Sequence, residues 1–96
     1  MSVSVARVPT HSASRYLQQL AKHWGHKMDV TMSEEEGRIA FPNGVVLEMR
    51  ADGETLDVAL TVPDGEDVGR MRGVVSSHLD RFAFREAPLT FDWVTV

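Results

Sequence analysis

Two histidines, His23 and His26, stand three residues apart in the segment KHWGHK at residues 22–27. Residues at this spacing share one face of a continuous helix, so the two imidazoles could hold a transition metal together. Gly25 lies between them and is typical of a helix end, which leaves the shared face unsecured. Basic groups also gather at helix C-termini because the dipole and the free carbonyls favour cations. We favour this second interpretation.

A third histidine, His78, lies on the apolar stripe of a second predicted helix, within the arc of residues 71–82. We therefore expect it to be substantially buried. A buried imidazole needs a hydrogen-bond partner, which a backbone carbonyl or the Tyr16 hydroxyl could provide. The structural interpretation is a satisfied neutral histidine, and the functional one is a ligand-binding group or a general base.

Basic residues recur near the expected ends of both helices. The candidate ligand-binding residues are Lys22, His23, His26, His78, Arg81 and Arg85, and the candidate metal ligands among them are His23, His26 and His78. A basic cluster in an acidic protein suits a small carboxylate or phosphate ligand. We slightly favour an anion over a metal, because no carboxylate is obviously placed beside His23 or His78. For this basic cluster, which also includes Arg15 and Lys27, we prefer the simpler interpretation of ion pairing with Asp80, Glu86 and the glutamates at 34–36.

The composition narrows the class of protein. The chain has 96 residues, a formal net charge of −4 and no cysteine. Its acidic balance argues against nucleic-acid binding, and the missing cysteine removes disulfides and thiolate chemistry. The N-terminus lacks a secretory signal and no apolar run is long enough to span a membrane, so we expect a cytoplasmic location. No nucleophile context or particular cofactor is indicated, and we expect binding rather than catalysis.

Hydrophobic periodicity predicts the elements that position these residues. A first strand carries Val3 and Val5 on its apolar side, and an amphipathic helix follows over 13–24, capped by Thr10 or Ser12 and ended by Gly25. Residues 28–62 alternate as four antiparallel strands. Two-residue type I′ turns are predicted at 43–44 and at 52–53, where Asn-Gly and Asp-Gly tolerate positive φ.

Pro63 ends the meander and a second helix is predicted, with Glu66 and Asp67 in its first turn. A closing strand should carry Leu89, Phe91 and Trp93 on one face. Each strand has one apolar face, so the predicted fold class is α+β: a two-layer sandwich with an antiparallel sheet and two helices on one face, in the order β-α-β-β-β-β-α-β. This order resembles the TATA-binding-protein-like fold, and residues 1–96 form one predicted domain.

The strings ARVPT, SRYLQQLAKHWGHK, SSHLDRFAFRE and FDW resemble a family of small bacterial proteins known as domain of unknown function 2218. The similarity runs over nearly the whole chain. The family has no established activity, and some members are joined to flavin-dependent siderophore-interacting ferric reductases. The resemblance therefore implies an indirect link to iron or siderophore metabolism.

Three functional hypotheses follow. The first is a non-enzymatic binding or accessory domain that holds a small anionic ligand or a metal near the helix ends. The second is a homodimeric interaction module that uses the outward sheet face, where charges of both signs are self-complementary. The outward residues are Arg38, Ala40, Val46, Glu48, Arg50, Asp57, Ala59 and Thr61. The third and weakest is a small enzyme that uses His78.

Overall fold

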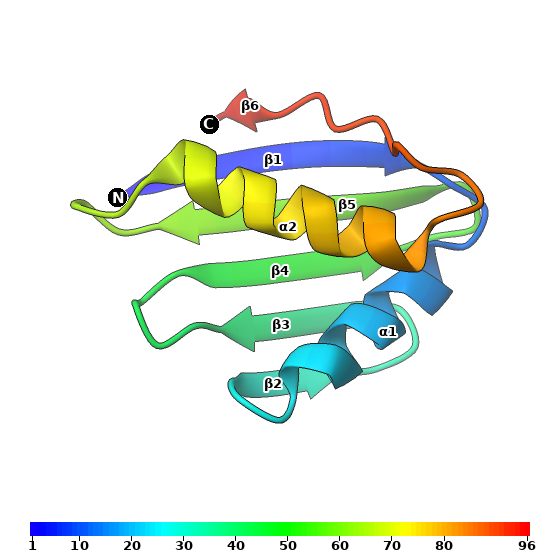
Figure 1. Ribbon diagram of the computed structural model, residues 1–96, viewed down its shortest axis with the longest axis horizontal. Coiled ribbons are helices and arrows are strands. Elements are labelled where there is room, and N and C mark those ends of the chain that lie inside the picture. Colours follow the sequence, from blue (N-terminus) through cyan, green and yellow to red (C-terminus); the bar gives the residue numbers. More distant parts are fainter.

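The computed structural model describes residues 1–96, which form one antiparallel sheet with both helices on the same side (Figure 1). The elements are β1 (Ser2–Pro9), α1 (Ala13–Trp24), β2 (Asp29–Met32), β3 (Glu36–Ala40), β4 (Val46–Ala51), β5 (Thr55–Val62), α2 (Val68–Phe82) and β6 (Val94–Thr95). The sheet order is β2-β3-β4-β5-β1-β6. The predicted element order and the α+β two-layer class are confirmed.

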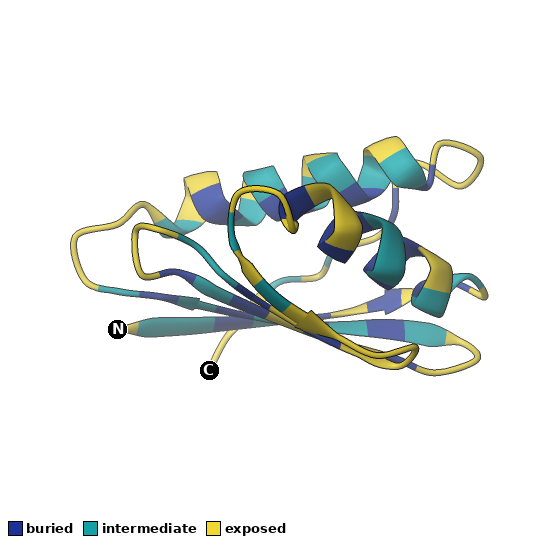
Figure 2. Cartoon of the chain, turned by 90° about the horizontal axis from the view of Figure 1, so that it is seen from below, coloured by how far each residue is buried: buried dark blue, intermediate teal, exposed yellow.

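The hydrophobic core lies between the helix layer and the sheet, where Figure 2 shows the buried residues. Alternate residues of β5 point into it, and Leu56 and Leu60 are fully buried. The predicted stripe of α1, from Ala13 to Trp24, is buried against β3 and β4. The period of two in the strands and the period of 3.6 in the helices thus direct one face of each element to a shared interior.

The prediction for the first strand was wrong about its covered side. Ser4, Ala6 and Val8 are the buried residues of β1, whereas Val3 and Val5 are half-buried on the side without helices. Register explains the difference, because Ser4 lies opposite Leu60 and cross-strand neighbours share a face. The buried Ser4 hydroxyl accepts hydrogen bonds from the Arg72 guanidinium of α2, at 2.8 and 3.0 Å.

The hairpin between β3 and β4 differs from the predicted two-residue loop. The Phe41 amide donates to the Val45 carbonyl at 2.8 Å, which leaves three residues, 42–44, in the loop. Gly44 has φ of +88°, but Asn43 does not have positive φ, and a type I′ turn needs it at both positions. Pro42 instead favours a type I turn, and the Asn43 side chain accepts from the Val45 amide.

The turn between β4 and β5 also differs from type I′, because Gly53 has no positive φ. Asp52 carries this turn through its carboxylate, which accepts hydrogen bonds from the backbone amides of Glu54 and Thr55 at 2.8 and 2.7 Å. These bonds lower the pKa of the Asp52 carboxyl below its ordinary value. The side chain, and not a left-handed glycine, shapes this hairpin.

The second helix begins after the predicted acidic pair. Asp67 is its N-cap, and the Asp67 carboxylate accepts from the Arg70 amide at 3.0 Å. The predicted closing strand is shorter than expected, since only Val94 and Thr95 pair with β1. Phe91 and Trp93 stack on each other outside a strand, with ring centroids 5.8 Å apart.

Candidate functional site

The ends of α1 and α2 meet in a junction built from imidazole and aromatic rings. The rings of His23 and His78 lie 5.6 Å apart, and His23 also meets Phe82 edge-on at 5.7 Å. Trp24 lies beneath them, 4.9 Å from His78. His23 is exposed, His78 is half-buried and Trp24 is buried. We call these four residues the histidine junction.

A helix carbonyl orients the His78 ring. The Nδ1 atom of His78 lies 2.7 Å from the Val74 carbonyl oxygen, one turn earlier in α2. A carbonyl can only accept, so Nδ1 carries the hydrogen and donates it. The Nε2 atom is thereby left free to bind a ligand: it accepts when His78 is neutral and donates when His78 is protonated. The predicted backbone partner is present, and Tyr16 does not take that role.

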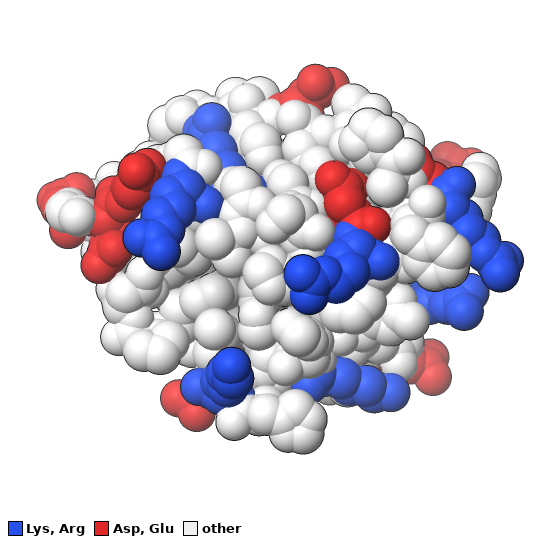
Figure 3. Space-filling model, viewed as in Figure 1, with Lys and Arg blue, Asp and Glu red and all other residues white.

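A hollow of about 370 Å³ adjoins the junction on the side of the β3–β4 loop. Phe41 and Val74 are among its lining residues, and Phe41 packs edge-on against Trp24 with centroids 5.0 Å apart. Its polar lining carries both signs of charge, from Glu66, Asp67 and Arg70. Figure 3 shows a largely uncharged area between the two helices, with charged side chains mainly around it.

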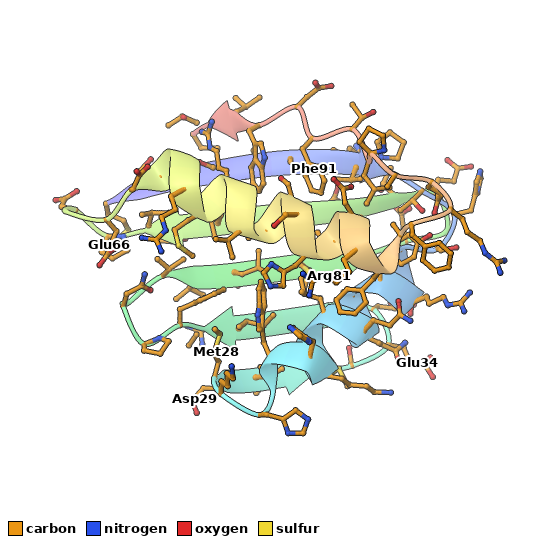
Figure 4. All side chains as sticks on the ribbon, in the orientation of Figure 1. Met28, Asp29, Glu34, Glu66, Arg81 and Phe91 are labelled. Atoms are coloured by element: carbon orange, nitrogen blue, oxygen red, sulfur yellow. The ribbon has the colours of Figure 1, made fainter.

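The structure brings together only part of the predicted basic set. Figure 4 shows Arg81 on the edge of α2 that faces α1, one turn beyond His78. Lys22 lines a separate polar hollow on the other flank of α1. His26 is exposed in the turn after α1, and Arg85 lies over the ring of Phe84 at 5.7 Å. His23 and His78 therefore form the candidate site, with Arg81 on the following turn of α2, whereas Lys22, His26 and Arg85 lie outside it.

The ion pairs predicted for the arginines and acids near the helix ends do not form. Glu86 instead accepts from the hydroxyls of Thr10 and Tyr16, and Asp80 accepts from the Leu89 amide at 2.8 Å. The hydrogen bond to Glu86, together with burial, raises the pKa of the Tyr16 hydroxyl. Glu86 thus fastens the segment after α2 to the start of α1, and Arg81 keeps its charge unpaired.

No three histidine, aspartate or glutamate side chains come close enough together to hold a metal ion. His23 and His78 alone would supply two ligands, whereas a structural zinc site takes four and a catalytic one takes three. The junction therefore offers two imidazole nitrogens to a ligand, but it does not supply the complete ligand set of a metal site.

The opposite side of the sheet, called here the outer face, carries the residues that alternate with the core. They are Val3, Val5 and Arg7 on β1, Glu36, Arg38 and Ala40 on β3, Val46, Glu48 and Arg50 on β4, and Asp57, Ala59 and Thr61 on β5. A hollow of about 770 Å³ lies on this face, with strand backbone as its floor and long charged side chains in its walls. No helix covers it (Figure 2).

These features define a small α+β domain with a one-sided helix layer and two separate candidate surfaces. The chain belongs to the family described as "Uncharacterized protein conserved in bacteria (DUF2218)", whose model matches residues 5–94. It is similar to PA4090 from Pseudomonas aeruginosa, solved by NMR, with 36% sequence identity and a TM-score of 0.80. That match covers 98% of this chain and 96% of PA4090.

Among curated proteins, none matches the sequence. Neither helix has the length and apolar character required to cross a bilayer.

Proposed function

We propose that this chain is a non-enzymatic binding domain that holds a small anion between His23 and His78 of the histidine junction, with Arg81 of α2 as a further donor. The observation that carries the proposal is the approach of two imidazoles from separate helices to 5.6 Å, with Nε2 of His78 left free by the bond to Val74. The imidazole of His23 and the guanidinium of Arg81 can donate charge-assisted hydrogen bonds to one carboxylate or phosphate, and His78 adds a further one from Nε2 in its protonated form.

The surroundings favour an anion over a metal. No carboxylate joins the two histidines to complete a ligand set, and the nearby acids Asp80 and Glu86 have other partners. Arg81 has no ion pair, so its charge remains available to a ligand. The buried ring of Trp24 provides an apolar floor, which strengthens hydrogen bonds made above it.

The resemblance to domains joined with ferric reductases makes ferric chelates the first ligands to test. Citrate is the simplest probe, because it is a small polycarboxylate and it also binds ferric iron. Free citrate, ferric citrate and inorganic phosphate together separate recognition of the carboxylate, of the iron complex and of anions in general.

Isothermal titration calorimetry with these three probes and with zinc tests the proposal. We expect citrate to bind, and His23→Ala and His78→Gln each to weaken its affinity by about tenfold or more, the cost of one charge-assisted hydrogen bond. His26→Ala and Arg85→Ala are matched controls that remove basic groups outside the junction, and they should leave the affinity unchanged. Equal affinity in wild type and His23→Ala would place the ligand elsewhere. Binding of zinc without any anion would reverse the preference for an anion.

Tryptophan fluorescence provides a second readout. Trp24 lies 4.9 Å from His78, whereas the other tryptophan, Trp93, packs against Phe91 at the far edge of the sheet. In a Trp93→Phe background, ligand binding at the junction should change the remaining emission. The same background with His23→Ala should give a weaker titration.

A further inference from the structure

We infer that the outer face pairs with the outer face of a second copy of this chain, about a two-fold axis that runs along the strands between β4 and β5. The inference is independent of the proposed ligand site, because the two surfaces lie on opposite sides of the sheet. It specifies which residues of the two copies meet, and the register of the sheet carries it.

Charges alternate in sign along one row of the outer face. Glu36 lies opposite Arg50, Arg50 opposite Asp57, and Asp57 opposite Arg7, so the row runs minus, plus, minus, plus across β3, β4, β5 and β1. Within one copy, Nε of Arg7 and Oδ1 of Asp57 are 3.5 Å apart. Both side chains remain partly exposed and can take a further partner.

When this row is placed against a second copy that runs in the opposite direction, each charge meets a charge of opposite sign. Two sheets that meet face to face can be related by a two-fold axis along the strands or by one across them. An axis along the strands reverses the row, so Arg50 meets Asp57 of the second copy and Glu36 meets Arg7 of the second copy. An axis across the strands and through the row would place each charged residue opposite the same residue of the second copy, so that like charges would meet. Electrostatic complementarity therefore selects the axis along the strands.

The remainder of the face supports contact. Val3, Val5 and Val46 are half-buried and point away from the helices, on the side of the sheet that no second layer covers. The proposed axis brings Val46 onto Thr61 of the second copy and Val3 onto Ala40 of the second copy. Arg38 and Glu48 lie opposite each other within one copy, so their charges can pair locally. Across β1, β3, β4 and β5, three arginines and three carboxylates of the outer face balance one another.

The hollow and the twist are compatible with this arrangement. Packed sheets lie about 10 Å apart and cross at about 30°, so the outer members of the row, about 7 Å from the axis, shift along the strands by about 4 Å. Arginine and glutamate side chains are long enough to span that shift. The hollow of about 770 Å³ gives the guanidinium groups of each copy room to enter the other.

The size of the face sets the expected strength. Together with β2, the strands of this face form a surface of β1 to β5, about 4.8 Å apart and up to about 20 Å long, which presents roughly 500 Å² per copy, or about 1,000 Å² in total. That area is at the lower limit for specific interfaces, so the pairing should be reversible and weak. Screening of the charged row should weaken it further as ionic strength rises.

Sedimentation velocity with charge-reversal variants tests the inference. As wild-type protein is concentrated from about 10 µM to about 1 mM, a range that spans weak affinities, the mean mass should rise towards twice that of the chain. Arg50→Glu would face Asp57 of the second copy, and Asp57→Arg would face Arg50 of the second copy. Each variant alone should therefore remain a monomer. Circular dichroism and thermal melting would establish that both are folded.

An equimolar mixture of the two variants is the decisive test of the proposed axis. In a pair with one copy of each, every position of the row meets its opposite charge again, so the equimolar mixture should form a heterodimer although neither component self-associates. Lys27→Glu, which reverses an exposed charge outside the outer face, is the matched control and should dimerise like wild type. A wild type that stays monomeric at about 1 mM overturns the inference, and so does undiminished dimerisation of Arg50→Glu. A mixture that stays monomeric although wild type dimerises overturns the proposed axis.

Discussion

The two sides of the sheet are built by the same strands, but they differ in how far apolar side chains are buried and in how polar groups find partners. On the helix side, the leucines of β4 and β5 are fully buried, and the polar groups of Ser4 and Glu86 have partners from distant segments. On the outer face, valines are half-exposed and the charges meet only their strand neighbours. The helix side is complete within one chain, apart from the histidine junction. The outer face has unused apolar surface and a row of charges that fits its own reverse.

The largest contrast should appear when neighbouring residues of one strand are truncated. Leu47 is fully buried against the helices, and Val46, the residue before it on β4, is half-buried on the outer face. Leu47→Ala should lower the free energy of unfolding by about 2–5 kcal/mol because it leaves a cavity. Val46→Ala should cost less than about 1 kcal/mol in dilute protein. Urea denaturation of both variants measures the difference, and equal losses would contradict the assignment of faces.

The second largest effect on stability should come from the loss of a polar contact on the helix side. Tyr16→Phe removes one hydroxyl donor from Glu86 and should lower the free energy of unfolding by about 1–3 kcal/mol. The raised pKa of Tyr16 means that the folded state favours the neutral phenol. Its stabilising effect is therefore complete below the ordinary tyrosine pKa and is lost as pH rises through the higher folded value. Wild type should lose more stability than Tyr16→Phe between neutral and strongly alkaline pH. Parallel losses would show that the contact has no such effect.

Replacing each of the two histidines of the junction should change the free energy of unfolding by a different amount, although both bind the proposed ligand. His78→Ala removes a half-buried ring from Trp24 and Val74, so we expect a loss of about 1 kcal/mol. His23→Ala changes an exposed residue and should alter the free energy of unfolding by no more than about 0.5 kcal/mol. Thermal melting without ligand measures both. A large loss in His23→Ala would indicate a structural role for that ring.

The smallest effect should come from the turn at Asp52. Its carboxyl pKa is lowered in the folded state by bonds from Glu54 and Thr55, so its stabilising contribution is present above the ordinary pKa and is lost as pH falls through the folded value. Asp52→Ala should therefore melt slightly below wild type at neutral pH, and the gap should narrow in acid. A gap that stays constant with pH would show that the ionised Asp52 carboxylate does not stabilise this turn.

Much of the fold could be predicted from the sequence because amphipathic periods are local. The stripe of α1 and the alternation of β5 follow directly from residue spacing. Alternation shows which residues share a face but not which face is covered, so Val3 and Val5 were assigned to the wrong side. The turn types were also wrong, because Pro42 and the Asp52 carboxylate outweighed the preference of Asn-Gly and Asp-Gly for positive φ.

The candidate site could be predicted only in part. Both helices had to lie on one face, which brought His78 near the end of α1, but the sequence could not select His23 over His26 without the crossing of the helices. The partners of Glu86 were missed because opposite charge suggested the nearby arginines. The hydroxyls of Thr10 and Tyr16 lie more than 60 residues away in sequence, and no local signal connects them.

A citrate titration followed by backbone amide chemical shifts locates the bound anion on one side of the sheet or the other. The proposed function predicts shifts concentrated at His23, Trp24 and His78, with the outer face unchanged at constant protein concentration. Shifts centred on Arg50 and Asp57, or no shift at saturating citrate, would contradict it.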